Sequence, residues 1–115
     1  MSGTTTHAVF MGHRTAPGER PVAVLVTASC SPHQPWFVRL CCIDEQACET
    51  TRWSFSRGAL FDGLTNPVVS EGVTLQPVGF ALLFSLNGSR TRRFLVQLDR
   101  AEFASFLVRV CLSDA

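Results

Sequence analysis

Three histidines are the first candidates for metal binding or proton transfer in this 115-residue sequence. His7 and His13 are six residues apart on an expected strand. They therefore share a face but lie too far apart to bind one metal ion without a third ligand. His33 lies between two prolines in an expected loop. We expect all three to be surface histidines and expect no metal site.

Five cysteines could supply a nucleophile or metal ligands: Cys30, Cys41, Cys42, Cys48 and Cys111. None has C-x-x-C spacing, and Cys41 and Cys42 point to opposite faces of a strand. His33 is the only histidine near Cys30, Cys41 or Cys42 in the sequence, and nothing marks it as their base. Their odd number and the absence of a secretion signal favour free thiols in the cytoplasm, packed as small buried hydrophobic residues.

Acidic residues gather in one expected loop, where Asp44, Glu45 and Glu49 lie close together. Their spacing lacks the D-x-D-x-D-G pattern of a calcium loop, which favours a solvated turn. Gly-rich phosphate loops, G-x-S-x-G and H-E-x-x-H are absent, and the chain has no lysine for Schiff-base chemistry. We therefore expect no enzymatic activity and no cofactor.

Arginines give the chain its one candidate binding feature. Arg90 and Arg92 alternate onto one face of an expected strand, with Arg93 opposite. With Arg39 or Arg52 on neighbouring strands they could form a shallow basic stripe for a phosphate backbone or an acidic protein tail. The net charge is only +1, and no solvent-facing aromatics are expected between these arginines. Nucleic-acid binding is thus less favoured than a solvated or partner-facing sheet edge.

The elements that hold these residues follow from hydrophobic periodicity and turn signals. The pattern predicts four strands, a short helix, three strands and a long helix. Asn87-Gly88 predicts a hairpin turn, and Asp99 with Glu102 predicts the start of the last helix. The expected strands are 7–13, 21–30, 36–44, 49–55, 72–78, 80–86 and 90–98, and the expected helices are 56–63 and 99–112.

The stretch WSFSRGALFDGL, residues 53–64, changes from strand to helix periodicity. We expect Trp53 and Phe55 in the core, Ser56 as the helix cap and Gly63 as its left-handed end. This corner is interpreted as a structural hinge. Arg57 lies in the first helical turn, where the helix dipole disfavours a cation. A carboxylate such as Asp62 or Glu102, a partner protein or solvent exposure could compensate.

Composition indicates one domain covering residues 1–115, with residues 1–6 expected to be disordered. Hydrophobic residues make up 46% of the chain and charged residues only 17%. In the last helix, the apolar spacing predicts one buried face with Phe103, Phe106, Leu107, Val110 and Cys111. So much apolar surface in so short a chain favours cover by further copies of itself. No transmembrane span is expected.

The sequence resembles the SsgA-like proteins of sporulating actinomycetes from about residue 32 to residue 110. The corner of that family reads W-x-F-A-R-D-L-L-x-x-G-L. Within residues 53–64 it is matched here by Trp53, Phe55, Arg57, Leu60, Gly63 and Leu64, whereas Gly58 and Ala59 stand in place of Asp-Leu. The family's G-D-V-x-V-x-P strand is resembled by EGVTLQP, with Gly72, Val73, Leu75 and Pro77, and its C-terminal F-L pair by Phe106-Leu107. A family D-P-Y-A-V strand start appears as QPWFV, with Gln34 and Trp36.

The resemblance implies an α+β, Whirly-like fold. It has two antiparallel sheets of about seven to eight strands, a short helix after strand 4 and a C-terminal amphipathic helix. It also implies a homotrimer that regulates sporulation-specific cell division and septation. The implied partners are FtsZ or its membrane-associated recruiters and the septal peptidoglycan machinery, and the implied location is the cytoplasm, concentrated at division septa. The alternative is a single-stranded nucleic-acid-binding module of the same fold.

Overall fold

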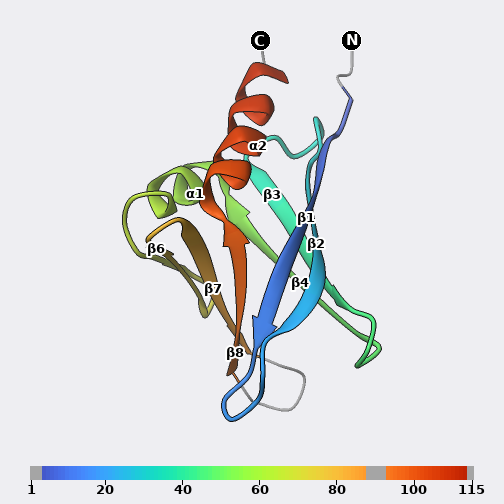
Figure 1. Ribbon diagram of the computed structural model, residues 1–115. Coiled ribbons are helices and arrows are strands. Elements are labelled where there is room, and N and C mark those ends of the chain that lie inside the picture. Colours follow the sequence, from blue (N-terminus) through green and yellow to red (C-terminus); the bar gives the residue numbers. More distant parts are fainter. Residues whose placement is uncertain (1–3, 88–92, 114–115) are drawn as a thin grey trace.

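The computed structural model describes residues 4–87 and 93–113 (Figure 1). The expectations of disorder at residues 1–3 and of a hairpin turn at Gly88 lie outside the described residues. The chain contains β1 (Thr6–Thr15), β2 (Val22–Cys30), β3 (Phe37–Asp44), β4 (Glu49–Ser56), α1 (Arg57–Gly63), β5 (Val68–Ser70), β6 (Val73–Val78), β7 (Ala81–Asn87), β8 (Arg93–Asp99) and α2 (Arg100–Ser113). Thr6, expected in a disordered start, begins β1.

The eight strands form one antiparallel sheet in the order β4-β3-β2-β1-β8-β7-β6-β5. The predicted α+β class, with a short helix after the fourth strand and a C-terminal helix, is confirmed. The expected two sheets are joined, because β1 pairs with β8 through three residue pairs, from His13 with Gln97 to Thr15 with Leu95. Each half is a run of four antiparallel strands, and this short seam makes them continuous.

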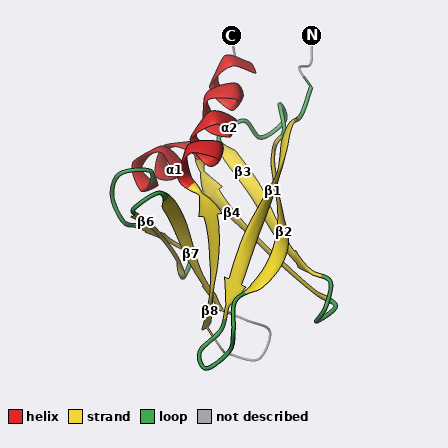
Figure 2. Ribbon diagram, in the orientation of Figure 1, coloured by secondary structure: helices red, strands yellow, loops and turns green. Residues whose placement is uncertain are grey.

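Alternation along the strands sends apolar side chains to one side of the sheet. In β2, Val24 and Val26 are buried, whereas Leu25 and Thr27 on the other face are half-buried. As predicted, β2 is an internal strand, between β1 and β3. The sheet folds over so that both halves share one core. Both helices lie at the same end of the sheet (Figure 2).

Helix α2 covers this core with Phe103, Phe106, Leu107 and Val110, all of which are buried. Its start is capped as predicted, since the backbone N–H of Glu102 donates to Asp99 Oδ2 at 2.9 Å. The prediction that Cys111 belongs to the buried face is wrong, because Cys111 is exposed. It follows Val110 by 100° around the helix axis and so lies at the margin of the apolar stripe.

The corner between β4 and α1 has the predicted start and an unexpected end. Ser56 caps α1, accepting a hydrogen bond from the backbone N–H of Ala59 at 3.1 Å. Gly63 does not have the positive φ of a left-handed conformation. The helix ends instead at Leu64, which has a φ of −68°. A Cβ at Gly63 would instead collide with the Leu75 side chain. The glycine permits close packing of α1 on β6, which corrects its predicted role.

A tight turn joins β6 to β5, the strand that the sequence pattern did not predict. Glu71 and Gly72 both have positive φ, 50° and 81°, as a two-residue type I′ hairpin turn requires. β5 has only three residues, Val68–Ser70, and this is too short for alternation to be recognised. The described part of the chain contains no helix long and apolar enough to cross a membrane.

Candidate functional site

Trp36 lies in the connection before β3 and is 67% exposed. The guanidinium of Arg57 lies over its indole ring, 5.7 Å from the ring centroid. In addition, the backbone N–H of Arg57 donates to the Trp36 carbonyl at 2.8 Å. The expectation that Trp36 shares the inward face of Val38 is wrong, because the strand begins only at Phe37. The contact between Trp36 and Arg57 was not foreseen from the sequence.

Two further aromatic side chains lie beside this contact. Phe37 is 49% exposed and pairs across the strands with Ser56, the residue before Arg57. Phe61, also exposed, is four residues after Arg57 and so lies next to it on the surface of α1. We call Trp36, Phe37, Arg57 and Phe61 the Trp36 surface. It corrects the expectation that no solvent-facing aromatics accompany the arginines of this sheet.

Arg39 and Arg52 continue this surface along the outer face of β3 and β4. Arg39 pairs with Ser54, and Arg52 pairs with Cys41, so the two arginines are diagonal neighbours. Together with Thr27 and Ser29 of β2, these side chains line a shallow depression. We call it the arginine depression. The expectation that Arg39 or Arg52 lies on a strand next to the one that carries Arg93 is wrong, because β2 and β1 lie between β3 and β8.

Arg93 does not join this group. It lies at the start of β8 and donates to Ser85 Oγ at 2.8 Å. The start of β8 and helix α1, which begins with Arg57, lie at opposite ends of the sheet (Figure 1). Arg90 and Arg92 lie outside the described residues, so their place in the predicted stripe is untested.

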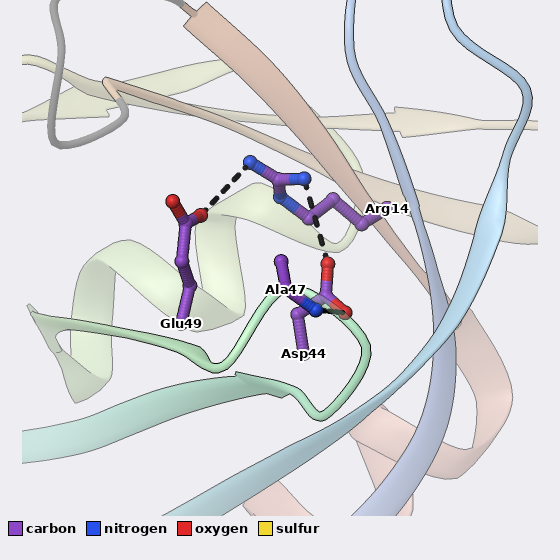
Figure 3. Close-up of polar contacts among 4 residues, drawn as sticks. All are labelled: Arg14, Asp44, Ala47 and Glu49. Atoms are coloured by element: carbon purple, nitrogen blue, oxygen red, sulfur yellow. Dashed lines mark hydrogen bonds and ion pairs between the residues drawn. The ribbon is translucent and has the colours of Figure 1, made fainter.

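Arg14 forms a separate polar cluster at the far end of the β3–β4 hairpin (Figure 3). Its guanidinium pairs with Asp44 at 3.5 Å and with Glu49 at 3.4 Å, and it also lies over the Phe94 ring. Asp44 Oδ1 accepts a hydrogen bond from the backbone N–H of Ala47 at 3.2 Å. Asp44 is buried, contrary to the predicted solvated turn, whereas Glu45 and Glu49 are exposed as predicted. The cluster ties β1 to this hairpin.

The remaining chemical candidates do not assemble into a site. No group of three or more His, Cys, Asp or Glu side chains that could hold a metal ion occurs among the described residues. Cys30 and Cys42 are buried as expected, whereas Cys48 and Cys111 are exposed. Burial raises the pKa of the Cys42 thiol from 9.0 to about 11, so it is protonated at neutral pH and a poor nucleophile. All three histidines are exposed, as predicted.

A second exposed apolar region surrounds Phe80, whose side chain is 89% exposed in the turn between β6 and β7. On one side Phe80 borders a groove with Met11 and Val78. On the other side it borders a groove with Leu64 and the first turn of α2. Two exposed residues, Val108 and Leu112, continue along α2. We call Met11, Val78, Phe80, Val108 and Leu112 the Phe80 surface.

Comparison with known proteins identifies the family. The family model described as "Streptomyces sporulation and cell division protein, SsgA" matches residues 24–111, which include the Trp36 surface. None of the curated proteins compared with the chain matches it.

Two solved structures share the fold. One is a structure from Streptomyces coelicolor whose description reads "Mutations in SsgB correlate to longitudinal cell division during sporulation". It has a TM-score of 0.82 and 21% identity, covering 96% of this chain and 88% of that one. The other is an SsgA-like sporulation-specific cell division protein from Thermobifida fusca, with a TM-score of 0.82 and 19% identity, covering 96% and 82%. The predicted resemblance is confirmed, and the chain belongs to the SsgA family of sporulation and cell division proteins.

Proposed function

We propose that this chain is a non-enzymatic regulator of sporulation-specific cell division that acts as a homo-oligomer and binds division proteins. The observation that carries the proposal is the SsgA family match over residues 24–111. The proposed partners are the FtsZ ring and the septal peptidoglycan machinery, and the proposed location is the cytoplasm at division septa. Recruitment of this kind needs exposed contact surfaces, and the chain has two of them, around Trp36 and around Phe80.

Self-association is proposed to use the Phe80 surface. Phe80 and Met11 expose most of their side chains, and Leu112 extends the apolar area along α2. Exposed apolar patches of this kind commonly mark contacts between proteins. A second copy that covers Phe80 would remove this surface from water. In a symmetric ring, the same contact would be repeated between each pair of neighbouring copies.

Light scattering on the purified chain tests the oligomer. We expect a mass of three times the 12.6 kDa chain. A Phe80→Asp variant should shift the mass toward the single chain, because a charge would be buried in the contact. Val69→Asp is the matched control, since Val69 is also exposed but lies on β5. A native chain of monomer mass at micromolar concentration would contradict the homo-oligomer.

Co-sedimentation with polymers of purified FtsZ tests the partner. We expect the native chain to pellet with the polymers and to remain in the supernatant without them. A chain that stays soluble with FtsZ polymers at saturating concentration would contradict this partner, and the septal peptidoglycan enzymes would then be the next to test.

A further inference from the structure

We propose that the Trp36 surface and the arginine depression together bind an acidic polypeptide segment that carries apolar side chains. This inference deepens the proposed function, on which it rests only in taking the partner to be a protein. It assigns a binding site and a partner chemistry to one face of the molecule.

The first support is the composition of the surface. Trp36 and Phe37 present exposed aromatic rings, and Arg57 lies beside them. Aromatic residues and arginine are enriched among the side chains that dominate binding energy at protein interfaces. Burying these rings against an apolar side chain of the partner would provide affinity, and the guanidinium would provide direction.

The second support is that the connection carrying Trp36 is fixed before any partner arrives. The N–H of Gln34 donates to the Ser31 carbonyl at 3.1 Å, and the N–H of Phe37 donates to the Gln34 carbonyl at 3.3 Å. Arg39 donates to Gln34 Oε1 at 2.9 Å. Because these bonds already order the connection, binding would cost little conformational entropy.

The third support is charge. Arg39 lies near the open end of the β3–β4 hairpin, Arg52 lies near the middle of β4, and Arg57 begins the adjoining helix. The acidic residues of the hairpin, Asp44, Glu45 and Glu49, lie at its closed end, where Arg14 pairs with Asp44 and Glu49. This local excess of positive charge matches a segment with carboxylates.

The geometry also suits an extended segment. β4 is the outer strand on this side of the sheet, so no further described strand pairs with its free edge. An extended chain running beside β4 could place carboxylates at Arg39 and Arg52 and an apolar side chain on Trp36.

A single-stranded nucleic acid is the less favoured occupant. One face of the Trp36 ring is already covered by Arg57, which reduces the area available for stacking a base. The net charge of +1 also gives no long-range field to attract a phosphate backbone.

Fluorescence titration of the full chain in a Trp53→Phe background tests the inference. Trp36 is then the only tryptophan, since the sequence has two. The probe is a short synthetic peptide in which Asp and Glu alternate with Leu and Phe. The comparison probes are the same peptide with Asn and Gln in place of the acids, and oligothymidylate. We expect the acidic peptide to shift the Trp36 emission and to bind at least tenfold more tightly than the neutral peptide.

Variants locate the site by fluorescence anisotropy of a labelled peptide. We expect Trp36→Ala and the double variant Arg39→Glu with Arg52→Glu each to weaken binding about tenfold or more. Arg20→Glu is the matched control, because Arg20 is exposed in the β1–β2 connection, away from the site. Circular dichroism checks that each variant folds, as exposed positions should allow.

Three results would overturn the inference: equal binding of the acidic and neutral peptides, unchanged binding by Trp36→Ala, or tighter binding of oligothymidylate than of the acidic peptide. The inference and the proposed function can fail separately. If the native chain forms a homo-oligomer and pellets with FtsZ but does not bind the acidic peptide, only this inference is wrong.

Discussion

The rings of Trp53 and Phe84 lie in contact, with centroids 5.3 Å apart and planes inclined by 60°, although β4 and β7 are not neighbours in the sheet. Phe55 adds a second contact to the same Phe84 ring at 5.8 Å. These rings join the two halves of the folded sheet across the core. Trp53 and Phe55 therefore belong to the core and hold the two halves of the sheet together.

Replacing Trp53 with alanine should lower the free energy of unfolding by about 3–5 kcal/mol, because a large buried ring leaves a cavity. Chemical denaturation measures the loss. Trp53→Phe is the control, and we expect it to cost less than about 1.5 kcal/mol. Trp53 Nε1 is buried without a hydrogen-bond partner in the described part of the chain, so phenylalanine sacrifices no such bond. Equal losses from the two substitutions would contradict this account.

Gly63→Ala should destabilise the protein by about 1–3 kcal/mol, because the added methyl group would collide with Leu75 and approach Val68 Cγ2 at 3.3 Å. Gly58→Ala, in the same helix, is the matched control. A Cβ at Gly58 would have no atom within 4 Å, so alanine should stabilise α1 by up to about 1 kcal/mol. Thermal denaturation should show melting temperatures that move in opposite directions. A stabilised Gly63→Ala variant would refute the packing role.

Arg14→Met should lower the free energy of unfolding by about 1–3 kcal/mol, because it removes the charged partner of buried Asp44. The same change made together with Asp44→Asn should cost less than the sum of the two single changes, since neither charge is then left buried alone. A double-mutant cycle from denaturant titrations measures the coupling. Additive effects would show that the pair contributes nothing to stability.

The Cys42 thiol should make stability fall as pH rises from 9 to 11. Burial raises its pKa from 9.0 to about 11, so the unfolded chain releases the thiol proton before the folded chain does. The stabilisation is complete below pH 9 and is lost as pH approaches 11. The sequence contains no tyrosine or lysine, so cysteine thiols are the side chains that can release a proton in this pH range. Denaturant titrations at several pH values measure the slope, and Cys42→Ala should flatten it. Equal slopes in both proteins would rule out Cys42 as the source.

Most of the fold could be predicted because its local signals are strong. Alternation located seven of the eight strands, and Ser56 and Asp99 marked both helix starts through side chains that cap the backbone. The failures have tertiary causes. The role of Gly63 depends on whether another element packs against it, as Leu75 of β6 does, and this contact is not visible in the local sequence. The pairing of β1 with β8 likewise joins residues that are far apart in the sequence.

The candidate site was harder to predict than the fold. Trp36 has the type and spacing of a core residue in β3, and only the position of the strand start at Phe37 leaves it exposed. The predicted arginine stripe includes Arg90 and Arg92, which lie outside the described residues. Arg39 and Arg52 are brought together by strand pairing, and Arg57 is brought to Trp36 by the β4–α1 corner. QPWFV contains the missed signal: the proline directly before Trp36 has no N–H for strand pairing and favours a strand start after it.

The pairing of His13 with Gln97 has a consequence for synthesis on the ribosome. β1 is the first strand to leave the exit tunnel, yet its β8 neighbour is almost the last. During translation, the edge of β1 that pairs with β8 stays unpaired until most of the chain has been synthesised. Nascent chains on neighbouring ribosomes of one polysome could pair at this edge instead.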